Sequence, residues 1–104
     1  DKKFGAAGNK VVVEEFLEGP EVSVLAFTDG KTIVPMVTSC DHKRALDNDE
    51  GLNTGGMGTF SPAPFYGEKT ERETMEKIML PTVAAMNAEG RTFRGVLYFG
   101  LMKT

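Results

Sequence analysis

The stretch 38–66 constrains the fold most. Few apolar residues recur in it at the regular spacing of a helix or a strand, so the sequence predicts neither element there. Unstructured stretches of this length are uncommon in compact domains and are usually functional or disordered. Three aromatic residues, Phe60, Phe65 and Tyr66, supply apolar anchors that a solvated linker lacks. We therefore expect a functional loop over 38–66. Its turn-forming residues are Asp41, Asp47, Asn48, Asp49, Gly51, Asn53, Gly55, Gly56, Gly58, Pro62 and Pro64.

Two β-rich runs precede this loop. Three valines and a Phe-Leu pair lie within 11–17, and apolar residues alternate through 22–27. Both patterns are typical of strands, and Glu18-Gly19-Pro20 between them predicts a turn. The sequence thus predicts an antiparallel strand meander over 1–37.

A second turn is predicted at Asp29-Gly30. Asp-Gly between two apolar runs is a strong hairpin signal, so a third strand is expected over 32–37. Pro35 has no backbone donor, which places this strand at the edge of the sheet or ends it there.

An amphipathic helix is expected over 67–90, followed by a largely buried strand over 91–104. Pro81 should kink the helix or begin a second segment, because its ring removes a donor and crowds the preceding turn. Gly90 is a suitable helix terminator. These elements predict an α+β fold, an antiparallel sheet with a Pro-interrupted helix. The helix positions that recur at three- and four-residue steps are Met75, Ile78, Met79, Thr82, Val83 and Met86.

Composition excludes several classes of function. The 104 residues carry a net charge of −3 and so offer no broad basic face to a nucleic acid. No apolar run approaches the roughly 18 residues that span a membrane, and no hydrophobic signal core opens the chain. Cys40 is the single cysteine, too few for a disulfide framework or a thiolate metal site. We expect a cytoplasmic protein that binds neither nucleic acid nor membrane.

The ends of the chain suggest a piece of something larger. The sequence begins without Met and ends at Leu101-Met102-Lys103-Thr104, which reads as the tail of a strand without a polar terminator. We therefore expect these residues to form part of a larger domain.

Acidic residues mark the first candidate site. Glu14 and Glu15 interrupt an apolar run, and Glu21 follows the turn after it. Carboxylates at a strand end can accept hydrogen bonds from the amine of adenine and from ribose hydroxyls. A solvated hairpin tip explains the same pattern, so both interpretations stay open.

Two further segments suit phosphate groups. Asp41-His42-Lys43-Arg44 places the only histidine beside two cations, although basic triplets are common on surfaces. In 51–58, three glycines among four residues would let backbone amides approach an anion closely. A tight turn before Ser61-Pro62-Ala63-Pro64 explains the glycines equally well.

Read together, these segments resemble the phosphoribosylamine-glycine ligases of the ATP-grasp superfamily. The resemblance covers practically the whole chain. It implies that ATP phosphorylates the carboxylate of glycine and that 5-phosphoribosylamine then displaces phosphate to form an amide, in purine synthesis. The motifs that carry it are Glu14-Glu15-Phe16-Leu17-Glu18-Gly19-Pro20-Glu21, Asp41-His42-Lys43-Arg44, Asn53-Thr54-Gly55-Gly56-Met57-Gly58, Ser61-Pro62-Ala63-Pro64 and Arg94-Gly95-Val96-Leu97-Tyr98-Phe99-Gly100-Leu101-Met102.

The resemblance also implies roles for individual residues. Glu14 would meet the adenine amine, Phe16 and Leu17 would offer backbone groups to the ring, and Glu21 would hold the ribose. The residues implied near the phosphates and reacting substrates are His42, Lys43, Asn53, Thr54, Gly55 and Gly56, with the loop running on to Gly58.

The implied cofactors are ATP and magnesium, with the magnesium ligands on a strand expected after Thr104. A chain without that strand should be inactive alone. The alternatives are a non-catalytic nucleotide-binding module of the same type and a structural fragment whose pocket never closes.

Overall fold

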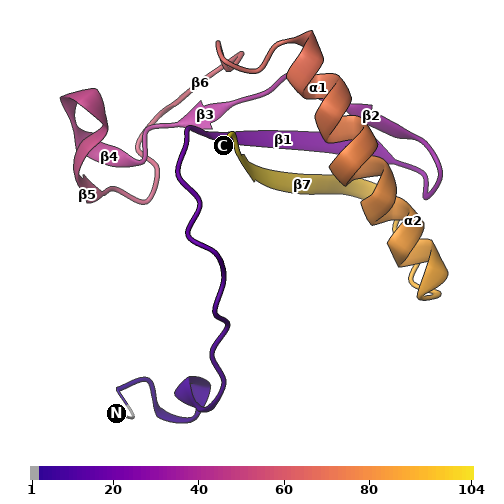
Figure 1. Cartoon of the computed structure of the whole chain (residues 1–104), viewed down its shortest axis with the longest axis horizontal. Coiled ribbons are helices and arrows are strands. Elements are labelled where there is room, and N and C mark those ends of the chain that lie inside the picture. The colour runs from indigo at the N-terminus through magenta and orange to yellow at the C-terminus, as the bar shows by residue number, and fades with distance from the viewer. Residues whose placement is uncertain (1–2) are drawn as a thin grey trace.

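The computed structural model describes residues 3–104, which form a small sheet crossed by a helix, with an extended arm before it (Figure 1). The arm holds a 3-10 turn, Gly5–Asn9, and then residues 10–20 without helix or strand. The other elements of the described residues are β1 (Glu21–Thr28), β2 (Ile33–Pro35), β3 (Cys40–Asp41), β4 (Arg44–Leu46), a 3-10 turn (Asp47–Asp49), β5 (Glu50–Asn53), β6 (Thr59–Phe60), α1 (Glu68–Thr74), a π-helical turn (Met75–Met79), α2 (Leu80–Ala88) and β7 (Gly95–Met102).

The main sheet has the strand order β2-β1-β7 and is antiparallel throughout. β1 lies in the middle and pairs with β7 along its whole length, from Glu21 opposite Met102 to Thr28 opposite Gly95. β2 lies at an edge and ends at Pro35, as the missing donor of that residue predicts.

The predicted hairpin at Asp29-Gly30 is confirmed, since it joins β1 to β2. A carboxylate oxygen of Asp29 accepts hydrogen bonds from the amides of Lys31 and Thr32, each 2.8 Å long. These bonds lower the pKa of Asp29, because they favour its charged form. Gly30 has a φ of +97°, which a residue with a side chain rarely adopts.

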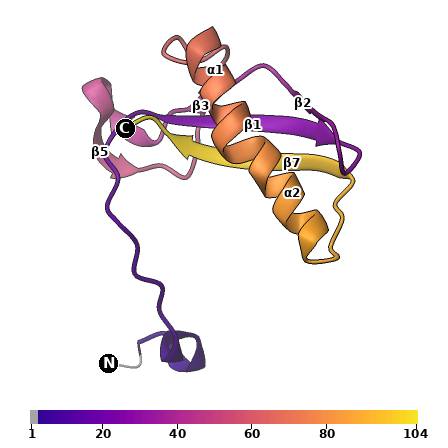
Figure 2. The same cartoon turned by 45° about the vertical axis from the view of Figure 1, so that its right-hand side comes forward.

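The helix lies across one face of the sheet (Figure 2) and is interrupted where the sequence predicts. Pro81 stands at the start of α2, directly after the π-helical turn. In that turn the amide of Leu80 donates to the carbonyl of Met75, five residues back. The wider turn before the proline accommodates the ring that would crowd a regular helix. Gly90, with a φ of +69°, follows the end of the helix as expected.

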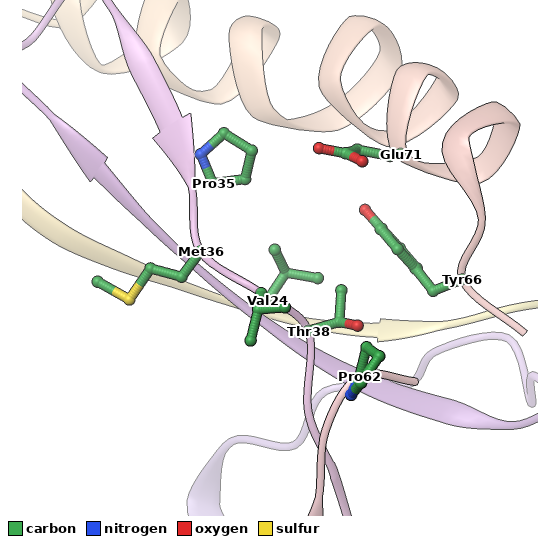
Figure 3. A pocket seen from close by; sticks show the side chains of 8 residues that line it. Val24, Pro35, Met36, Thr38, Pro62, Tyr66 and Glu71 are labelled. Carbon is green, nitrogen blue, oxygen red and sulfur yellow. The ribbon is translucent and has the colours of Figure 1, made fainter. Parts of the chain in front are cut away.

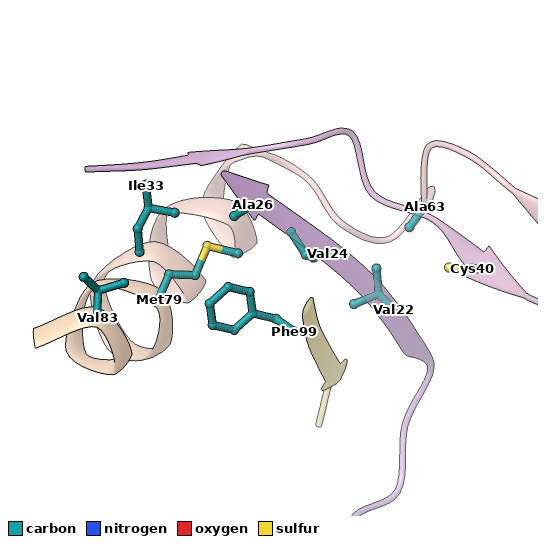
Figure 4. Packing of buried hydrophobic residues seen from close by; sticks show 9 residues of the cluster. All are labelled: Val22, Val24, Ala26, Ile33, Cys40, Ala63, Met79, Val83 and Phe99. Atoms are coloured by element: carbon teal, nitrogen blue, oxygen red, sulfur yellow. The ribbon is translucent and has the colours of Figure 1, made fainter. Parts of the chain in front are cut away.

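The core forms between this helix and the sheet (Figure 4). Alternate residues of β1 point toward the helix, which explains the period-two pattern in the sequence. Met79, 1% exposed, comes from the π-helical turn. The buried cluster contains Val22, Val24, Ala26, Ile33, Cys40, Ala63, Met79, Val83 and Phe99.

The predicted strand over 11–17 is not formed. These residues are exposed, and the side chain of Val13 reaches 90% exposure. β1 already has β2 and β7 on its two sides, so no place beside it is left for another strand. High β-propensity alone does not make a strand, and residues 11–17 pair with no other segment of the described chain.

The prediction that the last strand is largely buried is also wrong. Phe99 is buried, but Val96 is exposed and Tyr98 is 63% exposed. The helix covers one face of the sheet, and the side chains on the opposite face of β7 therefore remain open.

The stretch 38–66 has more regular structure than predicted. β3 pairs with β6, and β4 pairs with β5, in two small antiparallel sheets. The turn between β4 and β5 contains Asn48 and Asp49, both with a φ of 57°. Asparagine and aspartate tolerate this left-handed conformation better than other residues with side chains, which allows the reversal.

Candidate functional site

Two of the predicted site residues, Glu21 and Lys43, meet at one end of the main sheet. The ammonium Nζ of Lys43 lies 3.1 Å from Oε2 of Glu21 and 3.1 Å from Oδ2 of Asp41. The hydrogen bonds to Asp41 and Glu21 raise the pKa of Lys43. The three side chains are 38%, 48% and 25% exposed, for Lys43, Glu21 and Asp41 in turn. A ligand can therefore reach all three.

The backbone explains why residues far apart in sequence meet here. Ser23 and Ser39 exchange two hydrogen bonds of 2.8 and 3.0 Å, which fix the chain after β2 beside the start of β1. Lys43 follows four residues after Ser39, and Glu21 precedes Ser23 by two. The contact between Glu21 and Lys43 thus depends on this bridge.

The glycine-rich loop is tied to the same segment. The amide of His42 donates to the carbonyl of Gly58 at 2.9 Å, and the amide of Thr54 donates to the carbonyl of Lys43 at 2.8 Å. The hydroxyl of Thr54 also donates to the carbonyl of His42 at 2.9 Å. These bonds make residues 42–58 one structural unit that carries both Lys43 and the glycines.

The glycine amides already have partners within the loop. The side chain of Asn53 accepts from the amide of Gly55 at 3.0 Å, and the hydroxyl of Thr54 accepts from the amide of Gly56 at 3.2 Å. The φ angles of Gly55 and Gly56 are +77° and +91°. Asn53 and Thr54 therefore shape the loop, and the two amides do not form an open anion cradle in this conformation.

The imidazole of His42 packs against Phe60, with ring centroids 5.4 Å apart and an angle of 43° between the planes. A methyl group on Gly58 would lie 3.3 Å from the same imidazole, which is tighter than ordinary contact. His42 is thus held between β6 and the end of the glycine-rich loop.

The remaining predicted site residues lie on the arm (Figure 2). Glu14, Phe16 and Leu17 are exposed and belong to the extended residues that lead into β1. The structure therefore gathers Glu21 with Lys43 and the glycine-rich loop, and leaves the residues predicted to contact adenine outside this group.

Sequence reasoning missed two residues of this region. Asp41 belongs to the Asp41-His42-Lys43-Arg44 motif, but the sequence alone predicted no role for this residue. Gly19 lies where the backbone of Lys103 passes close by, and the amide of Lys103 donates to the carbonyl of Pro20 at 3.0 Å. The Glu18-Gly19-Pro20 pattern predicted a turn at Gly19. No local pattern indicated that the backbone of Lys103 would lie beside it.

Two cavities lie outside the predicted site. The first, about 230 Å³, opens between the chain after β2 and the start of α1 (Figure 3), and the hydroxyl of Tyr66 is buried beside it without a hydrogen-bond partner in the described part of the chain. The second, about 200 Å³, lies between the helix and the end of β7. The first is lined by Val24, Pro35, Met36, Val37, Thr38, Pro62, Tyr66 and Glu71.

Within residues 3–104, no three acidic, histidine or cysteine side chains are grouped so that they could hold a metal ion. These residues therefore do not fit a magnesium site. The same residues contain no helix long and apolar enough to cross a membrane.

Comparison with known proteins identifies relatives over almost the whole chain. The phosphoribosylamine-glycine ligases of Neisseria meningitidis serogroup A and of Escherichia coli are 55% and 54% identical to it over 102 and 99 residues. The crystal structure of the phosphoribosylamine-glycine ligase from Thermotoga maritima matches 86% of this chain with a TM-score of 0.73 and 38% identity.

The match covers a limited part of each relative. The chain spans 24% of the Neisseria enzyme, 23% of the Escherichia coli enzyme and 22% of the Thermotoga maritima chain. It matches the family described as phosphoribosylglycinamide synthetase, ATP-grasp (A) domain, over residues 1–104. The α+β fold and this match together show that the chain belongs to the phosphoribosylglycinamide synthetase ATP-grasp (A) domain family.

Proposed function

We propose that this chain supplies the ribose- and phosphate-handling part of an ATP-dependent ligase that joins glycine to 5-phosphoribosylamine. The observation that carries the proposal is the meeting of Glu21 and Lys43, 3.1 Å apart, on a unit tied to the glycine-rich loop. An anionic group for ribose hydroxyls and a cationic group for phosphate thus lie side by side.

In the proposed reaction, a glycine carboxylate oxygen attacks the terminal phosphorus of ATP, and ADP leaves. The amine of 5-phosphoribosylamine then attacks the carbonyl carbon of glycyl phosphate, phosphate leaves and the amine loses a proton. The products are glycinamide ribonucleotide, ADP and phosphate. The first step needs stabilisation of negative charge on the transferred group, and the intermediate needs protection from water.

The chain's own residues suit these two requirements. The ammonium of Lys43 is a compact charge that can contact phosphate oxygens. The loop from Asn53 to Gly58, shaped by its own side chains, would cover the reacting groups, and His42 would hold the end of that loop. Magnesium is implied for this chemistry, but the described residues group no set of side chains that fits it.

Nucleotide binding requires the contact between Glu21 and Lys43 to open. In this structure, Glu21 and Lys43 form an ion pair with each other. When Glu21 accepts bonds from ribose hydroxyls and Lys43 donates to phosphate, each exchanges one charged partner for the nucleotide. The adenine would lie near Glu14, Phe16 and Leu17, which requires the arm to fold over it.

The test is an assay of the full-length protein that carries this chain. We expect phosphate release from ATP that depends on both glycine and 5-phosphoribosylamine, and we expect Lys43→Ala to lower kcat. Wild-type turnover in Lys43→Ala would remove Lys43 from the phosphate site. ATP binding without turnover by a folded wild-type protein would contradict the ligase proposal and support a non-catalytic nucleotide-binding module.

A further inference from the structure

We propose that Asp41 is a positioning residue, which holds the ammonium of Lys43 at the phosphate site after Glu21 has turned to the nucleotide. The inference rests on the proposed function. It follows from the two carboxylates that share Lys43, because the nucleotide competes for only one of them.

The two carboxylates differ in how firmly they are placed. Asp41 belongs to β3 and pairs with Thr59 of β6, and Glu21 pairs with Met102 of β7, so the difference lies in the side chains. Glu21 reaches Lys43 from the first residue of β1 with a longer side chain, and it is 48% exposed against 25% for Asp41. Asp41 therefore offers the shorter and better shielded support.

The carboxylate of Asp41 also lies near the glycine-rich loop. Its Oδ2, the atom that contacts Lys43, lies 3.6 Å from the place where a Cβ on Gly56 would stand. A side chain at position 56 would therefore stand beside the carboxylate that contacts Lys43.

The chemistry of lysine allows this division of roles. An ammonium group has three donors and no acceptor, so one bond to Asp41 leaves two donors for phosphate oxygens. Its four-carbon stem is flexible, and an ammonium without a fixed partner samples many positions. The hydrogen bonds to Asp41 and Glu21 also raise the pKa of Lys43, because they favour its charged form.

The test measures ATP and AMP affinity by calorimetry in the full-length protein. Asp41→Asn removes the charge with little change of shape. We expect its Kd for ATP to rise by about 5- to 10-fold, a modest effect because the ion pair is partly exposed. Its Kd for AMP should stay within about twofold, since AMP lacks the outer phosphates. Intact AMP binding also shows that the variant is folded.

Asp47→Asn is the matched control, because it removes the same charge from the same loop without a contact to Lys43 in the described ion pairs. Asp41→Glu should recover part of the ATP affinity. In a Lys43→Met background, Asp41→Asn should have no further effect on ATP binding, since the group it positions is gone.

Three results would overturn the inference: an Asp41→Asn protein that binds ATP like Asp47→Asn, equal weakening of AMP and ATP, or the same loss in the Lys43→Met background. A folded wild-type protein that does not bind ATP would instead refute the proposed function, and the role of Asp41 with it.

Discussion

Replacing Gly19 with alanine should destabilise the fold, although Gly19 lies in an exposed segment. Its φ is +152°, and a Cβ there would collide with the carbonyl oxygen of Lys103 and lie 2.8 Å from the carbonyl carbon. Both atoms belong to the backbone, so no side-chain rotation relieves the clash. The amide of Lys103 donates to Pro20 next to this point, and separating the two segments breaks that bond.

The cost of Gly19→Ala can be worked from these contacts. The lost backbone hydrogen bond contributes about 1 kcal/mol. A strained backbone at residue 19 adds about 1 to 3 kcal/mol. Alanine restricts the unfolded chain more than glycine does, which offsets about 0.5 kcal/mol. We expect the free energy of unfolding to fall by about 1.5 to 3.5 kcal/mol.

Urea unfolding followed by circular dichroism measures this change. Gly8→Ala is the matched control, because Gly8 has no positive φ and no atom within 4 Å of the added methyl group. It should change the free energy of unfolding by less than about 0.5 kcal/mol. A Gly19→Ala protein as stable as Gly8→Ala would refute the close approach of Lys103 to Gly19.

Three further predictions concern the core and the ion pairs. Met79→Ala should lower the free energy of unfolding, measured by urea denaturation, by about 2 to 4 kcal/mol. Leu80→Ala, at an exposed neighbouring position, should lower it much less, and equal losses would contradict the packing of Met79. Glu21→Ala should raise the KM for ATP in the full-length protein by about 5- to 150-fold in steady-state kinetics, and an unchanged KM would remove Glu21 from the ribose site. The raised pKa of Lys43 means that its ion pairs stabilise the fold below the ordinary value of 10.5 and that this contribution is lost as the pH rises through the raised pKa. The stability difference between wild type and Lys43→Met should therefore vanish in strong alkali, and a difference that persists there would contradict this origin.

Local patterns predicted the parts of the fold that local interactions decide. The alternation along 22–27 identified the face of β1 that packs on the helix, and Asp29-Gly30 identified the hairpin. Pro81 marked the interruption of the helix, because its ring removes a donor and fixes the backbone at its own position. Gly90 marked the end of the helix, because glycine readily adopts the positive φ found there.

The failures share a different cause. The valines of 11–17 have the propensity of a strand, but the predicted meander needs a place beside β1, and β2 and β7 occupy both of its sides. The exposure of β7 depends on which faces the helix covers, and this is a property of the whole assembly. The short strand β4 was not predicted, because its side chains are all exposed and show no alternation. The Asp47–Asp49 turn that follows it was the one local signal of a reversal there.

The candidate site divides in the same way. The motifs identified Glu21, Lys43 and the glycine-rich loop, since the chemistry of each is visible in its residues. The contact between Glu21 and Lys43 needed the bridge from Ser23 to Ser39, a pairing across the chain that no local signal indicates. The role proposed for Asp41 became visible only once its carboxylate was placed beside the ammonium of Lys43.

The most direct test of the proposed function is a chimaera. The segment of the Escherichia coli phosphoribosylamine-glycine ligase that is 54% identical to this chain is replaced by the residues of this chain. We predict that the chimaera forms glycinamide ribonucleotide from ATP, glycine and 5-phosphoribosylamine, and that Lys43→Ala in the inserted segment lowers its kcat. A folded chimaera that binds 5-phosphoribosylamine and glycine but forms no product would contradict the proposal that these residues handle the nucleotide of the ligase.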